Sequence, residues 1–388
     1  MVHNFYQIGG GEHTVFENEV NLLRNHGHKV FLYTRNNDEL KTSKVKLLLS
    51  PFSTLWSFKT YREVKNLIKK KRIDIVHCHN TFPLISPSVY YAARKCGVPV
   101  IQTIHNFRFL CPNGSFYCNG HICEVCNEKC NFKNALKNRC YRNSLIQTFV
   151  VVTMLKLHRV LGTYRKINYI FLTEFNKRKF DKLIDINGAN VFVKPNFVND
   201  ISKIERSVID KTFVFAGRLD ENKGIKLLLE RWKTLPEDYC LHIYGNGNLE
   251  DEVRKISNKE KNIVYLGFKP QTVIFSDISH AIALAFPSTW YEGFPMIIAE
   301  SMALGCPILA TDIGNQADIL KESKGGVLFN PKSVESFNSA IEKIISENEK
   351  LSRNAQNYYK NYLNREKGYI SLENIYDQSV KRGGANSK

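Results

Sequence analysis

The segment from residue 281 to 305 reads AIALAFPSTWYEGFPMIIAESMALG and holds the pattern on which the predicted fold depends. Its first six residues, 281–286, form a continuous apolar run that predicts a strand buried on both faces. Pro295 suits the first turn of a helix, where no helical hydrogen bond is lost, and Gly305 suits the end of that helix. A buried strand followed by a helix is typical of a parallel sheet covered by helices.

The same alternation of strands and helices runs through the rest of the chain. Further candidate strands are 28–33, 73–78, 98–104, 169–172, 191–193, 213–216, 240–244, 263–266 and 307–310. Helical patterns at 12–25, 55–71 and 227–234 lie between them. Ten strands are too many for one ordinary doubly wound sheet, so we expect an α/β protein of two parallel-sheet domains. The Pro- and Asn-containing segment 194–200 sets the boundary, which gives domains at 1–197 and 198–388.

Positive charge is concentrated in the first half of the chain. The 388 residues are 43% apolar, which excludes a disordered or low-complexity protein. Lys and Arg number 55 against 37 acids, a net charge of +18. Residues 1–200 contain 30 basic and 13 acidic side chains, whereas residues 201–388 contain 25 and 24. This asymmetry favours an anionic partner such as phosphates, acidic lipid or nucleic acid, and a solubilising surface is the alternative.

The chain shows no pattern of a secretory signal or a membrane span. The N-terminal sequence MVHNFYQIGGG lacks a basic start and an apolar core. The most apolar stretch, 145–161, is interrupted by polar residues and is shorter than the ~20 residues that a span needs. We therefore expect a cytoplasmic protein whose ten cysteines stay mostly reduced.

Two carboxylates bracket the start of the predicted helix at Pro295. Glu292 lies in the preceding loop and Glu300 lies in the second turn. Backbone N–H groups and the helix dipole at such a start bind phosphate, and carboxylates accept hydrogen bonds from sugar hydroxyls. Taken alone, the two residues could be a solvated loop acid and a surface helix residue. The flanking Gly293-Phe294 pair and the small residues of the helix favour a binding site.

Two cations follow the first predicted strand of the second half. The segment 216–224 reads AGRLDENKG, which places Arg218 and Lys223 beyond the carboxyl end of that strand. There they could neutralise a departing diphosphate, with an exposed basic turn as the alternative.

The Gly-Arg-x4-Lys pattern ending at Lys223, together with the E-x7-E pair, resembles glycosyltransferase family 4. These are retaining enzymes with two facing Rossmann-like domains of the GT-B type and an active-site cleft between the domains. The resemblance covers nearly the whole chain. It implies that Arg218 and Lys223 bind the pyrophosphate of a nucleotide-sugar donor and that Glu300 binds the ribose hydroxyls. Glu292 would act catalytically on the transferred sugar.

The same resemblance assigns further donor contacts to backbone groups. Those of Gly293, Phe294 and Pro295 would assist Glu292. Gly245 and the turn at 267–268 would lie near the nucleotide base.

The first half supplies matching pieces. The run 9–11 is Gly-Gly-Gly after a short strand, so Gly10 and Gly11 would let backbone approach the diphosphate, with a plain strand-to-helix turn as the alternative. Thr14 breaks the G-x-G-x-x-G fingerprint, so a dinucleotide site is unsupported. His105 follows the strand 98–104. A histidine there is commonly structural, but the resemblance implies a catalytic position beside the anomeric carbon. The histidines at 77 and 79 are expected to line the cleft without a catalytic role.

Six cysteines lie in the insert 111–140. Two of them form the C-x-x-C pair Cys123 and Cys126, which can chelate a tetrahedral metal. The insert begins with Cys-Pro-Asn-Gly and resembles a subgroup of the family from surface and capsular polysaccharide pathways. That resemblance implies that four cysteines of the insert could bind a structural zinc. They are Cys111, Cys123, Cys126 and Cys140. Reduced thiols, a redox pair and an iron–sulfur cluster remain alternatives.

Segment 144–161 predicts a helix with two interpretations. It is either buried in the first domain or an apolar surface near lipid, since basic residues flank it. They are Arg139, Arg142, Lys156, Arg159, Arg165 and Lys166. A second basic cluster at 69–72 is either membrane-facing or a solvated helix end.

Together these patterns predict a retaining, metal-independent hexosyltransferase of cell-surface polysaccharide or lipopolysaccharide synthesis. The second domain would hold the nucleotide sugar, and the first a glycan or polyprenyl-diphosphate-linked acceptor. No cofactor is expected for catalysis, because no D-x-D pair follows a strand, and no nucleic acid is expected as partner. The enzyme would lie peripherally on the anionic inner face of the cell membrane. Alternatives are an epimerase or phosphorylase of the same architecture, a dehydrogenase without its glycine fingerprint, and a basic nucleic-acid-binding protein.

Overall fold

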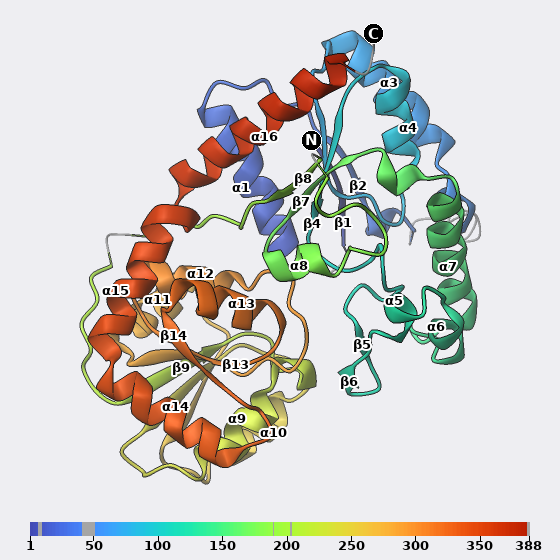
Figure 1. Ribbon diagram of the computed structural model, residues 1–388. Helices are drawn as coiled ribbons and strands as arrows, with labels where there is room; N and C mark the ends of the chain where they lie inside the picture. Colours follow the sequence, from blue (N-terminus) through green and yellow to red (C-terminus); the bar gives the residue numbers. More distant parts are fainter. Residues whose placement is uncertain (7–9, 41–50, 189, 202–203, 386–388) are drawn as a thin grey trace. The chain divides into compact units, whose positions relative to one another are not determined.

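The computed structural model describes residues 1–6, 10–40, 51–188, 190–201 and 204–385, which form two compact units (Figure 1). The first consists of Met1–Cys118, Cys123–Pro195 and Tyr369–Lys388, and the second of Asn119–Ile122 and Asn196–Gly368. The expected division at 197/198 differs from this one at the C-terminus, where the chain returns to the first unit. The reason is packing: Leu372 and Ile375 join a buried cluster with Leu23, Ile101 and Ile170.

The first unit contains a six-stranded parallel sheet in the order β2-β1-β3-β4-β7-β8. The strands are β1 (Val2–Phe5), β2 (Tyr33–Asn36), β3 (Val76–Asn80), β4 (Val100–Ile104), β7 (Asn168–Phe171) and β8 (Val191–Val193). The helices are α1 (Gly11–Asn25), α3 (Phe58–Lys71), α4 (Ser88–Lys95), α7 (Leu145–Val160), α8 (Glu174–Arg178) and the last part of α16 (Arg365–Ala385). Short elements occupy the insert: β5 (Tyr117–Cys118), β6 (His121–Ile122), α5 (Val125–Glu128) and α6 (Lys133–Lys137).

The second unit contains another six-stranded parallel sheet, in the order β11-β10-β9-β12-β13-β14. The strands are β9 (Thr212–Ala216), β10 (Cys240–Tyr244), β11 (Ile263–Gly267), β12 (Ala283–Phe286), β13 (Ile308–Thr311) and β14 (Gly326–Phe329). The helices are α9 (Ile225–Trp232), α10 (Glu250–Ser257), α11 (Gln271–His280), α12 (Met296–Ala303), α13 (Gly314–Ser323), α14 (Val334–Ser346) and α15 (Asn348–Tyr358). The prediction of two parallel α/β sheets is confirmed.

Two strands differ from the prediction. The strand expected at 28–33 begins only at Tyr33, which pairs with Val2, and continues to Asn36. The strand expected at 73–78 is β3, which lies further along the chain at Val76–Asn80. His77 and His79 therefore lie inside a fully buried strand rather than at its end.

Helices cover both faces of the second sheet, as the side chains of β9 show. Phe213 and Phe215 pack into one buried cluster with Trp232 of α9, whereas Val214 packs into the other with Ile298 of α12. Successive side chains of a strand point to opposite faces, so both faces of the sheet are core. This explains why the strands read as continuous apolar runs.

The strand order of each sheet reverses at one place, and this reversal positions the candidate site. In the second unit the reversal lies between β9 and β12, and in the first between β1 and β3. Ligands of open α/β sheets bind beyond the carboxyl ends of the strands at such a point. Within the described ranges, no helix is both long and apolar enough to cross a membrane.

Candidate active site

The loops after β9 and β12 are joined at the strand-order reversal of the second unit. The carbonyl oxygen of Asn222 accepts the backbone N–H of Thr289 at 3.0 Å and its hydroxyl at 3.2 Å. Gly224 has a φ of +74°, and a Cβ there would lie 1.8 Å from the carbonyl oxygen of Pro287. Only glycine fits this approach, so the backbone holds the two loops in register.

Glu292 and Lys223 meet across this junction. Glu292 is 7% exposed, and its Oε1 lies 2.7 Å from the Lys223 ammonium nitrogen. The same oxygen accepts hydrogen bonds from the Ser288 hydroxyl at 2.8 Å and from the Trp290 indole N–H at 2.6 Å. The ammonium also lies 5.4 Å from the centre of the Trp290 ring. Three donors on one oxygen fix the carboxylate beside the cation.

A buried amide fixes the backbone on either side of Glu292. The side chain of Asn315, on α13, donates to the carbonyl oxygens of Glu292 and Gly293. Asn315, Ser288 and Trp290 were not predicted as site residues from the sequence. Ser288 and Trp290 lie in the quoted segment but carry no recognisable spacing, and Asn315 reaches the loop only through the fold.

Glu300 lies on α12 with few partners of its own. Its Oε1 is 3.4 Å from the amide nitrogen of Gln271, and burial raises its pKa to about 7. A half-buried carboxyl with such a weak contact retains acceptor capacity for ligand hydroxyls. The helix begins after Pro295, which provides no side-chain cap, and Phe294 is partly buried.

Arg218 and Gly245 lie beyond the neighbouring strands β9 and β10. Arg218 is 60% exposed and pairs with Asp220 at 3.0 Å. Gly245 has a φ of +127°, and a Cβ there would lie 1.9 Å from the carbonyl oxygen of Gly217. Backbone packing therefore explains this glycine. On the next loop, Phe268 is 75% exposed.

In the first unit, Gly10 and Gly11 begin α1, and Gly9 lies outside the described residues. A Cβ at Gly10 or Gly11 would meet nothing within 4 Å, so packing does not require glycine there. Glu12 follows, and burial raises its pKa to about 8 although Arg108 opposes the shift. The sequence analysis did not single out this acid.

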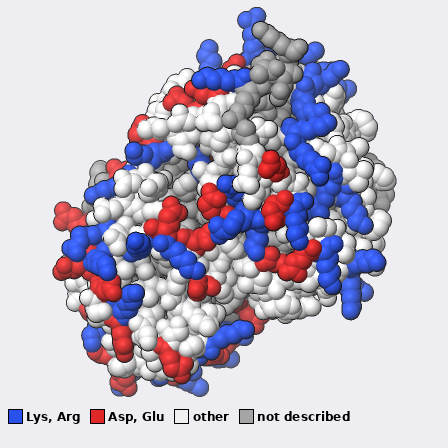
Figure 2. Space-filling model, viewed as in Figure 1, with Lys and Arg blue, Asp and Glu red and all other residues white. Residues whose placement is uncertain are grey.

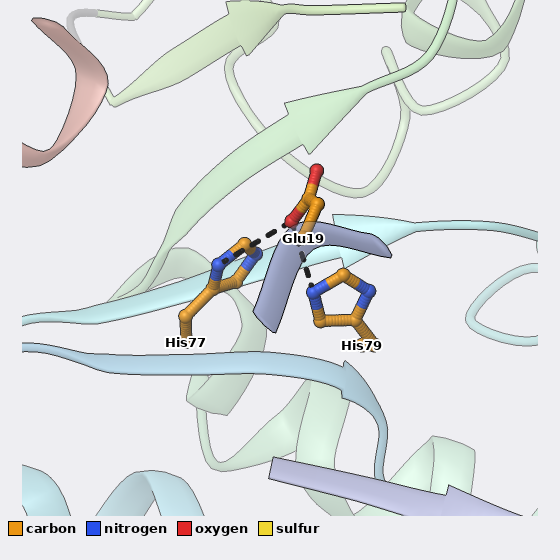
Figure 3. Close-up of side chains that lie close together, drawn as sticks. All are labelled: Glu19, His77 and His79. Carbon is orange, nitrogen blue, oxygen red and sulfur yellow. Dashed lines mark ion pairs between the residues drawn. The ribbon is translucent and has the colours of Figure 1, made fainter. Parts of the chain in front are cut away.

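His105 is partly buried and lies at the end of a cluster of buried polar side chains. Figure 3 shows three members of this cluster, Glu19, His77 and His79, with the carboxylate of Glu19 facing both rings. Its Nε2 is 2.9 Å from Nδ1 of His79, and Nε2 of His79 is 3.2 Å from Oε2 of Glu19. The other oxygen of Glu19 is 2.7 Å from the Lys194 ammonium. Oε2 of Glu19 also lies 4.0 Å from Nδ1 of His77. His79 and His105 line a cavity of about 30 Å³.

Charge and burial set the protonation of this cluster. Burial alone would raise the pKa of the Glu19 carboxyl, but the Lys194 ammonium and then His79 outweigh it and hold the pKa well below its usual range. Burial lowers the pKa values of His77 and His105 well below the ordinary histidine value. His105 is therefore neutral near pH 7.

The cysteine insert does not form a complete metal cage in the described part of the chain. Cys140 lies beside Cys118, with the sulfurs 3.9 Å apart, although Cys118 was not among the expected ligands. Among the described residues, Glu19, His77 and His79 are the single group of three or more ligand atoms within 4.8 Å of one another. Burial raises the pKa of Cys126 to about 11, so a metal would have to displace its proton.

Two Rossmann-like parallel sheets, with an acid–cation pair at the strand-order reversal of the second, define the GT-B class of glycosyltransferases. Two family models agree: "Glycosyltransferase Family 4" matches residues 8–152, and "Glycosyl transferases group 1" matches residues 198–361. The chain is thus a GT-B glycosyltransferase of the family 4 type.

Individual relatives are distant but span most of the chain. An Escherichia coli UDP-Gal:alpha-D-GlcNAc-diphosphoundecaprenol alpha-1,3-galactosyltransferase is 24% identical over 82% of this chain and 79% of its own length. The structure of the lipopolysaccharide outer core galactosyltransferase WaaB is 17% identical, with a TM-score of 0.62 over 97% of this chain and 99% of that one. Anabaena HepE in complex with UDP is 15% identical, with a TM-score of 0.64 over 97% and 99%.

Proposed function

We propose that this chain is a retaining transferase that moves a sugar from a nucleoside diphosphate to a glycan acceptor during cell-surface polysaccharide synthesis. The observation that carries the proposal is the Lys223–Glu292 pair at the strand-order reversal of the second unit, held by Ser288 and Trp290. The UDP in the HepE structure and the UDP-galactose in the name of the E. coli relative support a nucleotide-sugar donor.

In this proposal, cations of the chain stabilise the leaving group. Cleavage of the bond between the anomeric carbon and the phosphate oxygen leaves negative charge on the diphosphate. Arg218, Lys223, the backbone at Gly10 and Gly11, and the start of α12 after Pro295 provide positive potential for it. These groups replace the charge of a divalent ion, so catalysis is metal-independent. Glu300 accepts hydrogen bonds from the ribose hydroxyls.

The transferred sugar is oriented by Glu292 and His105, the two proposed catalytic residues. Backbone groups of Gly293 and Phe294 assist Glu292, and Gly245 lies near the base. The acceptor oxygen forms its bond to the anomeric carbon on the face from which the phosphate departs, which preserves the configuration. The acceptor proton passes to the departing phosphate oxygen, so no separate protein base is needed.

The identity of the products tests this function. The purified chain is incubated with a panel of sugar nucleotides and a lipid-linked glycan, and the products are followed by mass spectrometry and proton NMR. We expect free nucleoside diphosphate, a glycan longer by one sugar, and the anomeric configuration of the donor, all unchanged by excess chelator. A new sugar nucleotide without a longer glycan would indicate an epimerase, and an inverted linkage would contradict retention.

We further propose that the acceptor is lipid-linked and that α7 rests on an anionic membrane surface at the inner face of the membrane. The predicted helix is present, but one of its faces is apolar and exposed: Ile146 is 74%, Phe149 59% and Val160 86% exposed. These residues recur at helical spacing. Figure 2 shows Lys and Arg side chains on the side of the first unit where α7 lies. An apolar face flanked by cations suits an acidic lipid surface.

We propose that four cysteines of the insert hold a structural zinc, drawn from the expected Cys111, Cys123, Cys126 and Cys140 and from Cys118, which lies beside Cys140. The supporting observation is the 3.9 Å separation of the Cys118 and Cys140 sulfurs, which fits two thiolates on one zinc at about 2.3 Å each. Elemental analysis should find about one zinc per chain, lost in Cys126→Ser but retained in Cys96→Ser. Less than about one metal in ten chains would contradict a zinc site.

A further inference from the structure

Four side chains of the first unit form a continuous line that is buried except at its last member, His105, and the proposed function uses only that residue. The line runs from Lys194, directly after β8, through Glu19 on α1 and His79 on β3 to His105 after β4. Lys194 and Glu19 are each 1% exposed. Buried charges cost free energy unless they are paired, and this ion pair cancels both charges.

His77 lies beside these four side chains, but its ring nitrogens contact other residues. Its Nδ1 is 2.7 Å from the Tyr376 hydroxyl and its Nε2 is 2.7 Å from the Thr103 hydroxyl. Both ring nitrogens thus have hydroxyl partners. Oε2 of Glu19 is closer to His79, at 3.2 Å, than to His77, at 4.0 Å. The carboxylate therefore acts mainly on His79.

The order of donors and acceptors along the line follows from proton counting. Nε2 of His79 and Oε2 of Glu19 approach to 3.2 Å without hydrogen-bond geometry, but an ionised carboxylate cannot donate a proton, and its charge favours a proton on the nitrogen that faces it. With this single proton, the His79 ring presents a lone pair on Nδ1. Nε2 of His105, 2.9 Å away, must donate its proton to that lone pair. The remaining nitrogen of His105, Nδ1, is left as an acceptor.

We propose that Glu19, acting through His79, is a positioning residue that holds His105 as the Nε2–H tautomer, so that its Nδ1 accepts a hydrogen bond from a hydroxyl of the donor sugar. The inference rests on the proposed function, in which His105 contacts that sugar. Burial lowers the pKa of His105 and so supports the neutral ring. The Lys194 ammonium keeps Glu19 ionised. Hydrogen-bonded residues behind a histidine fix its tautomer and orientation in many metal sites, and these side chains would do the same for His105.

Glu19, His77 and His79 could instead bind a metal ion, because their ligand atoms lie within 4.8 Å of one another. Their other contacts favour hydrogen bonds over metal binding. The Lys194 ammonium already neutralises one oxygen of Glu19, and a divalent ion would lie close to this cation. Metal binding would also take a nitrogen of His77 from its hydroxyl partner. The ion pair and hydrogen bonds account for these groups without an ion.

The tautomer can be read directly from the full chain. Histidines are labelled with ¹⁵N, and long-range ¹H–¹⁵N spectra are assigned to His105 through His105→Gln. In the wild type we expect a single neutral form with the proton on Nε2. In Glu19→Gln/Lys194→Met, which removes both charges, the amide of residue 19 can donate or accept, so we expect both tautomers of His105.

The variant with mixed His105 tautomers should also have a lower kcat. In this double variant kcat should fall about tenfold, the size of one lost hydrogen bond, while KM for the donor changes less than about twofold. The exposed pair Glu349–Arg353 gives the matched control Glu349→Gln/Arg353→Met, which should match the wild type. If the double variant does not fold, His79→Gln breaks the line while leaving the Lys194–Glu19 pair in place, and the same two changes are expected.

Three results would overturn the inference. They are a wild-type His105 protonated on Nδ1, a double variant with wild-type tautomer and kcat, and one equivalent of metal that the wild type retains and His77→Gln loses. Failure of the proposed function is a separate result. In that case the wild type consumes no sugar nucleotide, but the spectra still show whether Glu19 sets the tautomer.

Discussion

At the scale of single residues, the two carboxylates of the E-x7-E pair have different environments. Glu292 receives three donors on one oxygen, including the Lys223 ammonium. Among the described residues, Glu300 has one side-chain contact, with the Gln271 amide at 3.4 Å, and burial raises its pKa to about 7. Three donors therefore hold the first carboxylate in place through one oxygen, whereas the second has no such set of donors among the described residues. Sequence spacing placed both near a helix start but could not separate these roles.

The raised pKa of Glu300 predicts that replacing this carboxyl increases the stability of the protein but weakens ligand binding. A carboxyl whose pKa is higher in the folded than in the unfolded chain stabilises the fold below the unfolded value and loses this stability as pH rises through about 7. Glu300→Gln, which has no charge to bury, should therefore gain about 1–2 kcal/mol in free energy of unfolding at pH 8 relative to the wild type. At pH 4 the two proteins should be alike.

Urea unfolding at the two pH values, with UDP titration in parallel, measures both effects. UDP binding should weaken in Glu300→Gln although the protein is more stable. A variant that is less stable than the wild type at pH 8 would show that Glu300 has strong partners inside the protein.

At the scale of elements, the site depends on how the loops after β9 and β12 approach each other. Gly224 and Gly267 share a φ of +74°, but only at Gly224 would a Cβ strike backbone, at 1.8 Å from the Pro287 carbonyl oxygen. At Gly267 a Cβ would meet nothing within 4 Å. The pair separates the effect of steric collision from that of backbone conformation.

Gly224→Ala should lose about 3 kcal/mol of stability or more, whereas Gly267→Ala should lose about 1 kcal/mol, the cost of the left-handed conformation alone. Because Gly224 joins the loops that carry Lys223 and Glu292, its variant should also lose UDP affinity. Denaturant unfolding and calorimetry provide the two measurements. Equal losses in both variants would mean that the loops adjust freely.

The strands could be predicted from sequence largely because several are apolar runs buried on both faces, as β9 and β12 show. β14 was missed, since its four residues, Gly326–Phe329, begin with glycine and carry too little pattern. The approach of Lys223 and Glu292 could be expected from the sequence, because both residues lie in loops beyond the carboxyl ends of strands of one sheet. The contact between Glu19 and Lys194 was not, because it joins residues 175 positions apart.

At the scale of the whole molecule, the charge asymmetry and the exposed face of α7 predict binding to acidic membranes. The excess charge of +17 lies in residues 1–200, and the apolar residues of α7 are in the same half. Binding to vesicles should rise with the fraction of anionic lipid and fall with salt, because screening weakens exposed charges. The prediction concerns the first unit, which contains both features.

Vesicle sedimentation with Ile146→Ser/Phe149→Ser tests the contribution of α7. The variant should bind acidic vesicles about tenfold or more weakly, since two large exposed side chains lose their apolar contact. Ile209→Ser removes an equally exposed apolar residue from the second unit and should bind as the wild type does. Binding that is indifferent to lipid charge and to the α7 residues would contradict a membrane-facing helix.

The central claim is that the cation at the strand-order reversal of the second unit captures a nucleoside diphosphate, and calorimetric titration with UDP tests it most directly. Lys223, which pairs with Glu292, and Lys226, which pairs with Glu252 on the surface, lie three residues apart and are compared as Lys223→Met and Lys226→Met. Loss of a charged phosphate contact should weaken UDP binding about tenfold or more in Lys223→Met, with Lys226→Met within about twofold of the wild type. Equal UDP affinity in both variants and the wild type would contradict the claim.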